Sequence, residues 1–201
     1  MKLLPRSRLL RWPIYLIGLA LVIFASIIVV FALQARMRYP ALKAWHRIAL
    51  KEEFTAGRVA SFDEYKKLEE RLFAEVRGRI IDDPDAADTN PLSRYTKDSV
   101  PGKLALNTVY NHSFELAPSD PRCSVLLVHG LSDSPYSFRA MGQTFFEQGC
   151  YVLALRMPGH GTIPAALRDV KWEDWYGAVV LAAKHAAAQA GPGEPFMAGG
   201  H

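Results

Sequence analysis

The sequence predicts an α/β domain with a mostly parallel sheet, preceded by one transmembrane helix. Two observations carry this prediction. Residues 12–35 contain no charged side chain, and residues 123–200 contain three short apolar runs separated by two segments with helical spacing of apolar residues. Alternation of strand, helix, strand, helix and strand forms parallel sheets through right-handed crossovers.

The uncharged segment of residues 12–35 has the length and composition of a membrane span. A helix of this length extends about 36 Å, against a hydrocarbon core of about 30 Å. Basic residues flank it on both sides, so the flanks do not fix its orientation. The flanking residues are Lys2, Arg6, Arg8, Arg11, Arg36, Arg38, Lys43, Arg47 and Lys51. The alternative is a signal peptide cleaved near Val30 and Ala32, but the apolar run exceeds the usual length of about 7 to 15 residues, which favours an uncleaved anchor.

The net charge of +4 is concentrated beside this segment. The chain has 24 Lys and Arg against 20 Asp and Glu, and residues 1–51 hold nine of the basic residues and no acidic one. Residues 52–201 therefore carry 15 basic and 20 acidic residues, a net charge of −5. Basic residues beside a membrane span favour anionic lipid headgroups. We expect a lipid bilayer as a partner and no nucleic acid, and nothing in the sequence indicates the oligomeric state.

Four segments are expected: a basic flank (1–11), the transmembrane helix (12–35), a juxtamembrane helical stalk and linker (36–102) and the α/β domain (103–201). Within the stalk, residues 61–81 have the pattern of an amphipathic helix, with a capping box formed by Ser61 and Glu64. Its apolar stripe is expected to pack on the next domain, with a partner-binding or membrane-lying helix as the alternative. The stripe consists of Phe62, Tyr65, Leu68, Leu72, Val76 and Ile80. Residues 82–91 are rich in turn-forming and acidic residues, which is typical of a linker.

The elements of the α/β domain follow from the period of its apolar residues. A half-buried strand is expected within residues 107–116, and a strand buried on both faces at 123–128. A helix with a glycine stop at Gly149 is expected over 134–149. A strand (151–157), a helix (172–191) and a last strand (194–200) follow.

Two loops leave the carboxyl ends of the buried strands, the edge at which open α/β sheets bind ligands. They are HGLSDSP at 129–135 and RMPGHGT at 156–162. Together, the segments VLLVHGLSDSPYSF, VLALRMPGHGT, WEDW at 172–175 and AGGH at 198–201 resemble α/β-hydrolases of the carboxylesterase and monoacylglycerol lipase group. The resemblance runs from about residue 103 to the end, and it implies the N-terminal half of an α/β-hydrolase sheet.

This resemblance implies a site at the first loop and at the last strand. The backbone amide of Leu131 would donate to an oxyanion, and Gly130 would let the backbone approach closely; one such donor contributes about 3 to 4 kcal/mol. Gly200 and His201 would begin a G-H-S-x-G nucleophile elbow, with serine at position 202. The chain is then expected to be truncated before the nucleophile, to lack the catalytic acid and base, and to be inactive by itself.

The activity implied is that of a membrane-anchored serine hydrolase that cleaves small esters or lipids through an acyl-serine intermediate. No metal-ligand spacing or phosphate-binding glycine loop occurs, so we expect no cofactor and no metal. Two alternatives share the same loops: an epoxide hydrolase or dehalogenase with an aspartate nucleophile, and an anchored binding module without catalysis.

Other polar and aromatic residues near the loops have structural interpretations. Ser132 and Ser134 are expected to be turn and cap residues, because GLSDSP lacks the last glycine of a G-x-S-x-G elbow. His160 precedes the expected nucleophile, whereas the triad histidine of this fold follows it, so His160 is expected to shape its loop. Trp172 and Trp175 are expected to pack in the core.

Cys123 and Cys150 stand at the starts of two of the expected strands. The sheet order of the hydrolase family implies that these strands are neighbours, which would bring the two Cα atoms within the 4.4 to 6.8 Å that a disulfide requires. A disulfide would indicate an oxidising compartment and place the domain outside the cytoplasm, on the periplasmic side in a bacterium. Two free buried cysteines are the alternative.

Overall fold

The computed structural model describes residues 6–39, 41–83, 85–106 and 109–200. The chain divides into two compact units, the first ending at Leu42 and the second beginning at Lys43.

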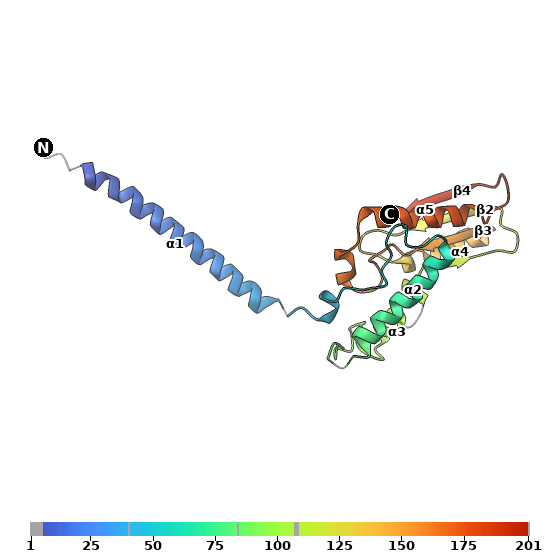
Figure 1. The fold of residues 1–201 in the computed structure, drawn as a ribbon, viewed down its shortest axis with the longest axis horizontal. Helices are drawn as coiled ribbons and strands as arrows, with labels where there is room; N and C mark the ends of the chain where they lie inside the picture. Colours follow the sequence, from blue (N-terminus) through green and yellow to red (C-terminus); the bar gives the residue numbers. More distant parts are fainter. Residues whose placement is uncertain (1–5, 40, 84, 107–108, 201) are drawn as a thin grey trace. The chain divides into compact units, whose positions relative to one another are not determined.

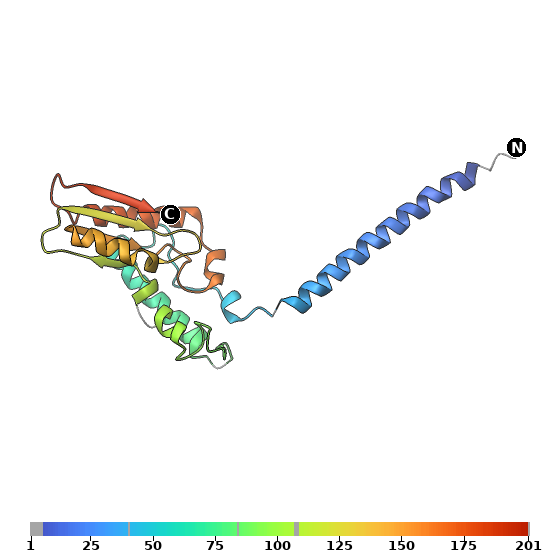
Figure 2. The same ribbon diagram turned by 180° about the vertical axis from the view of Figure 1, so that it is seen from behind.

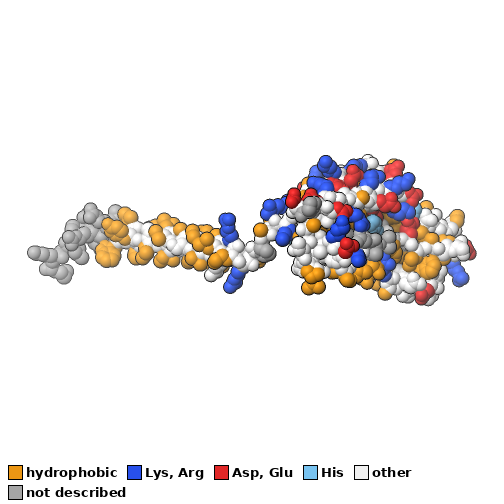
Figure 3. Space-filling model, turned by 90° about the horizontal axis from the view of Figure 1, so that it is seen from below, with side chains coloured by type: hydrophobic (Ala, Val, Ile, Leu, Met, Phe, Trp, Pro, Cys, Tyr) orange, Lys and Arg blue, Asp and Glu red, His pale blue; other side chains and the backbone are white. Residues whose placement is uncertain are grey.

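The first unit is one long helix, α1 (Arg6–Arg38). Every side chain described between Trp12 and Tyr39 is exposed, and Figure 3 shows apolar side chains along the helix, with basic ones at the end that carries Arg36 and Arg38. A helix that is apolar on all sides needs an apolar environment on all sides. The segment Trp12–Arg38 is long and apolar enough to cross a membrane, which confirms the predicted helix.

The second unit contains four strands, four α-helices and five shorter helical turns among the residues that the structure describes. The strands are β1 (Phe114–Leu116), β2 (Cys123–Val128), β3 (Cys150–Leu155) and β4 (Phe196–Gly200). The α-helices are α2 (Phe62–Val76), α3 (Val100–Leu106), α4 (Arg139–Glu147) and α5 (Trp172–Ala187). The turns are η1 (Ala44–His46), η2 (Arg77–Ile81, a π-helix), η3 (Val109–Asn111), η4 (Pro135–Phe138) and η5 (Pro164–Arg168).

The strands form one sheet in the order β1-β3-β2-β4. β2 pairs in parallel with both β3 and β4, and β1 pairs antiparallel with β3. The chain thus makes a β2-α4-β3-α5-β4 run with β2 in the centre, so the predicted α/β class and its mostly parallel sheet are confirmed.

Helices cover both faces of this sheet. α5 lies on the face turned toward the viewer in Figure 1, and α4 on the opposite face, which Figure 2 shows from behind. Because side chains alternate along a strand, Val125 and Leu127 of β2 pack in the core beneath α4, whereas Leu126 packs in the core beneath α2 and α5. The helices on both faces hold the sheet in place, and with it the loops that leave the ends of its strands.

α2 begins and packs as its sequence predicts. The hydroxyl of Ser61 accepts a hydrogen bond from the backbone N–H of Glu64 (3.2 Å), whose carboxylate accepts one from the N–H of Ala60 (2.8 Å). All six residues of the predicted apolar stripe are buried. The first part of the stripe packs with residues of β2, β3 and α5, and its last two residues, Val76 and Ile80, pack with Trp45 and Ile163. The predicted stalk and linker over 36–102, with its boundary at residue 103, stays a prediction.

The first strand is shorter than the sequence suggests. A strand was expected within residues 107–116, but residues 107 and 108 lie outside the described part of the chain, and β1 contains only Phe114–Leu116. The preceding residues form the turn η3, in which the side-chain amide of Asn111 donates to the carbonyl oxygen of Gly161 (3.1 Å). This bond holds the segment against a loop instead of along the sheet edge.

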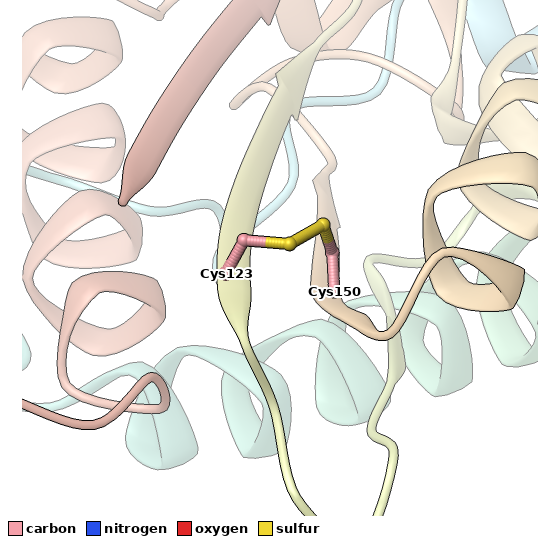
Figure 4. The surroundings of a disulfide bond; sticks show 2 residues. All are labelled: Cys123 and Cys150. Carbon is pink, nitrogen blue, oxygen red and sulfur yellow. A yellow bond between two sulfur atoms is a disulfide. The ribbon is translucent and has the colours of Figure 1, made fainter. Parts of the chain in front are cut away.

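Cys123 and Cys150 form a disulfide that joins the starts of β2 and β3 (Figure 4). The two residues are direct partners in the strand register, with Cα atoms 4.5 Å apart. They lie at the amino ends of the strands, and the two loops that carry the expected site leave the opposite ends.

Candidate functional site

The carboxyl ends of β2, β3 and β4 meet at one edge of the sheet. The register pairs Val128, the last residue of β2, with Leu155 of β3 and with Gly200 of β4. The loops that follow β2 and β3 therefore start side by side, and the end of β4 lies next to the first of them.

A cavity of about 280 Å³ lies at this edge. Its lining includes Leu131, Ser132 and Ser134 of the first loop, His160 of the second loop, and Arg94 from the segment before the sheet. The structure thus brings the two loops together around one cavity, in agreement with the rule that open α/β sheets bind ligands at this edge.

The backbone amide of Leu131 is directed by a tight turn. The N–H of Asp133 donates to the carbonyl oxygen of Gly130 (3.2 Å), so Leu131 is the first of the two residues inside the turn. Its side chain is 69% exposed. Within the described part of the chain, no group accepts a hydrogen bond from the Leu131 amide. That N–H is therefore able to donate to the oxygen of a bound molecule.

The ring of His129 ties the first loop to the second. Its Nε2 accepts a hydrogen bond from the backbone N–H of Met157 (3.0 Å), so the proton of the neutral ring sits on Nδ1, 2.9 Å from the carbonyl oxygen of Gly130. Burial lowers the pKa of His129 to about 4, which keeps the ring neutral and able to accept from Met157 at neutral pH. The sequence reasoning did not single out this residue.

His160, in the second loop, contacts the first loop. Its Nε2 lies 2.6 Å from the carbonyl oxygen of Leu131 and its Nδ1 lies 3.0 Å from that of Pro158. Both ring nitrogens thus face backbone carbonyls, which agrees with the expected loop-shaping role. The flanking Gly159 and Gly161 have φ angles of +80° and +76°, a backbone region that side chains other than glycine rarely enter.

Arg156 is a buried cation that sequence reasoning missed. Its side chain is fully buried; Nε donates to Glu69 (2.8 Å), one terminal nitrogen to Glu53 (3.0 Å) and the other to the carbonyl oxygen of His160 (3.0 Å). Burial would lower the pKa of Arg156, but attraction to Glu53 raises it above its ordinary value. Arg156 is the only Lys, Arg, Asp or Glu between Glu147 and Arg168. A single charged residue within a long uncharged segment is the sequence signal that could have identified Arg156 as a buried cation.

The structure shows where Trp172, Trp175 and Ser134 lie, and the expectation for Trp172 is wrong. Trp172 does not pack in the core: it is 67% exposed. The buried residues of α5 are Asp174, Ala178, Ala182 and Ala186, which recur every four residues along one face of the helix, and Trp172 lies off that face. Trp175 is partly buried, and its indole N–H donates to the carbonyl oxygen of Pro158 (3.0 Å). Ser134 occupies the N-cap position of η4, although its hydroxyl makes no capping bond.

The last strand ends on a glycine that the packing requires. A Cβ atom at Gly200 would lie 2.7 Å from the carbonyl oxygen of Val128, so no side chain fits there without moving the backbone. His201, the other residue expected to begin a nucleophile elbow, lies outside the described residues. The roles expected for Gly130, Leu131, Gly200 and His201 stay predictions.

Within the described ranges, no group of three or more His, Cys, Asp and Glu side chains could hold a metal ion. The expectation that the chain uses no cofactor stays a prediction.

Comparison with known proteins gives limited similarity. No protein-family profile matches the chain, and no curated protein does. A solved structure from work on two metagenome-derived lipolytic enzymes matches with 28% sequence identity and a TM-score of 0.39. The match covers 44% of this chain and 34% of the other, so it spans about a third of that enzyme's length. A TM-score below 0.5 does not establish a shared fold.

Proposed function

We propose that this chain is the N-terminal part of a membrane-anchored serine hydrolase that cleaves carboxylic esters. The observation that carries the proposal is the register between β2 and β4, in which Val128 pairs with Gly200. Adjacent strands lie about 4.8 Å apart, so a residue at position 202 would follow beside Gly130. A nucleophile there and the amide of Leu131 could contact one carbonyl group.

The reaction proposed is acyl transfer through the serine. The hydroxyl of a serine at position 202 attacks the ester carbonyl while a general base takes its proton, and the carbonyl oxygen becomes an oxyanion. The Leu131 amide donates to that oxyanion. Collapse of the intermediate expels the alcohol, which takes up a proton, and water then releases the acid from the acyl-serine. The base and its partner carboxylate would come from residues beyond position 201.

The disulfide and the anchor suggest where this reaction takes place. Structural disulfides persist in oxidising compartments, and the Cys123–Cys150 bridge lies in the second unit. With α1 as a single uncleaved span, the second unit would face the extracytoplasmic side of the membrane. Its substrates would then be esters or lipids that reach that side.

The test uses the protein encoded by the gene, including any codons after position 201. A fluorophosphonate probe should label residue 202, and the protein should hydrolyse p-nitrophenyl esters. Leu131→Pro removes the donor N–H at a turn position where proline is favoured, so kcat should fall by about 10²- to 10³-fold. Leu131→Ala keeps the N–H and serves as the matched control, with kcat within a few fold of the parent.

Labelling at another residue would refute the assignment of the nucleophile to position 202. Equal decreases of kcat in Leu131→Pro and Leu131→Ala would refute the role of the Leu131 amide as an oxyanion donor. A gene with an inert residue at position 202 and no esterase activity would leave an anchored binding module as the function. An aspartate at that position would point to an epoxide hydrolase or dehalogenase.

A further inference from the structure

Two large aromatic side chains at the start of α5 lie on the surface of the second unit. Trp172 and Tyr176 are 67% and 65% exposed. They are one helical turn apart, with ring centroids 6.4 Å from each other. A contiguous exposed apolar surface rimmed by polar residues is typical of an interaction site.

Three exposed basic residues lie on the segments next to these rings, together with two exposed acidic residues. η5 ends four residues before α5 begins and packs against η1, and the guanidinium of Arg168 donates to the carbonyl oxygen of Arg47 (3.0 Å). Arg47, Arg168 and Lys171 are exposed, and the exposed acids between the start of η5 and the first turn of α5 are Asp169, which follows η5, and Glu173. We name this surface the aromatic-basic patch; it consists of Arg47, Leu167, Arg168, Lys171, Trp172 and Tyr176.

A short length of chain joins α1 to the segment that precedes Arg47. Whatever the arrangement of the two units, four residues join Arg38 at the end of α1 to Lys43. Fully extended, they span at most about 18 Å. η1 begins immediately after Lys43, so η1, which directly precedes Arg47, is the part next to the patch that the chain keeps close to the helix end.

We propose that the aromatic-basic patch docks on the surface of the bilayer, with anionic lipid headgroups as its ligands. The proposal rests on α1 being a membrane anchor, as in the proposed function. Trp and Tyr side chains prefer the membrane–water interface. Lys and Arg beside them are attracted to anionic headgroups. Both chemistries occur together in this patch, and η1, against which η5 packs, follows α1 after a short segment of chain.

Docking would also favour one class of substrate. Leu167 of the patch lines the cavity at the carboxyl ends of the strands. With the patch on the bilayer, one rim of that cavity would face the headgroup layer. The substrate would then be a lipid ester taken from the membrane, in preference to a freely soluble ester.

The test measures the depth of spin labels on the full chain in lipid vesicles. A nitroxide is attached after Glu173→Cys in the patch, after Gln189→Cys just beyond the far end of the same helix as the matched control, and after Ser26→Cys in α1 as a reference. The native cysteines do not react because they form a disulfide. Collisions with oxygen and with a water-soluble nickel chelate are compared in vesicles with and without about a quarter of anionic lipid.

In anionic vesicles, the label at 173 should be shielded from the nickel chelate severalfold more than the label at 189. Trp172→Ala combined with Tyr176→Ala should remove this shielding. Leu92→Ala combined with Val100→Ala, which removes apolar side chains that are 81% and 71% exposed elsewhere, should leave it unchanged.

Equal nickel access at 173 and 189, with the label at 26 buried in lipid, would refute docking and leave the anchor intact. Nickel access at all three positions would refute the anchor and docking together. Shielding at 173 that persists in detergent without lipid, with spin–spin broadening, would show that the patch joins two copies of the chain, which also overturns the proposal.

Discussion

Replacement of Arg156 by methionine should be among the most destabilising single changes in the second unit. Arg156 is fully buried, and its partner Glu69 has a side chain that is only 2% exposed. Methionine fills a similar volume but leaves the Glu69 carboxylate buried without its cation. Removing one partner of a buried ion pair costs about 3 to 5 kcal/mol, which should lower Tm by roughly 6 to 20 °C in a unit of this size.

The matched control is Arg71→Met in α2. Arg71 also donates through Nε to a glutamate, Glu52, at 3.1 Å, but its side chain is 55% exposed. An exposed pair of this kind contributes about 0.2 to 1 kcal/mol. Urea unfolding of the full chain in detergent, followed by tryptophan fluorescence, measures both variants; Trp45, which is buried, and Trp175, which is partly buried, lie in the second unit.

The pH dependence gives a second test of the same reasoning. Burial raises the pKa of Glu69, although Arg156 opposes the shift. A carboxyl group whose pKa is higher in the folded state favours folding in its protonated form, so its unfavourable contribution decreases as the pH falls. The loss in the free energy of unfolding caused by Arg156→Met should therefore become smaller as the pH is lowered from 7.5 to 5. A loss no larger than that of Arg71→Met, or a loss independent of pH, would refute this account.

Three further perturbations address the site and its support. Gly200→Ala should expose the amides of β4 to hydrogen exchange, because its Cβ would lie 2.7 Å from a backbone oxygen, whereas Gly191→Ala, with its nearest contact at 3.8 Å, should not. Replacing Cys123 and Cys150 by alanine should cost about 3 to 4 kcal/mol in thermal unfolding, since the disulfide closes a loop with a sequence separation of 27; an unchanged Tm under reducing conditions would contradict this. The ring of His129, with its pKa lowered to about 4 by burial, should stay neutral at pH 5.5 in NMR titration, and its contribution to stability should be lost as the pH falls from about 6.5 toward 4; titration near pH 6.5 would show that the ring is not buried as described.

Local signals were sufficient to predict most elements of this chain. The uncharged run of residues 12–35 predicts α1, and Ser61 with Glu64 predicts the start of α2. Gly149, with a φ of +85°, lies just beyond the end of α4, where the predicted glycine stop stands. Each of these signals depends on neighbours within a few residues, so composition and period are enough to detect them.

The sequence by itself determined a helix long and apolar enough to span a membrane, the α/β class and the parallel order of the apolar strands. Only the tertiary structure decided that Arg156 meets Glu69 and Glu53, which are 87 and 103 residues away along the chain, that the cysteines are partners in register, and that Trp172 stays at the surface. The physical reason is the range of the interactions. Periodicity shows which face of an element is apolar, but the groups that meet across that face depend on how the crossovers bring distant segments together.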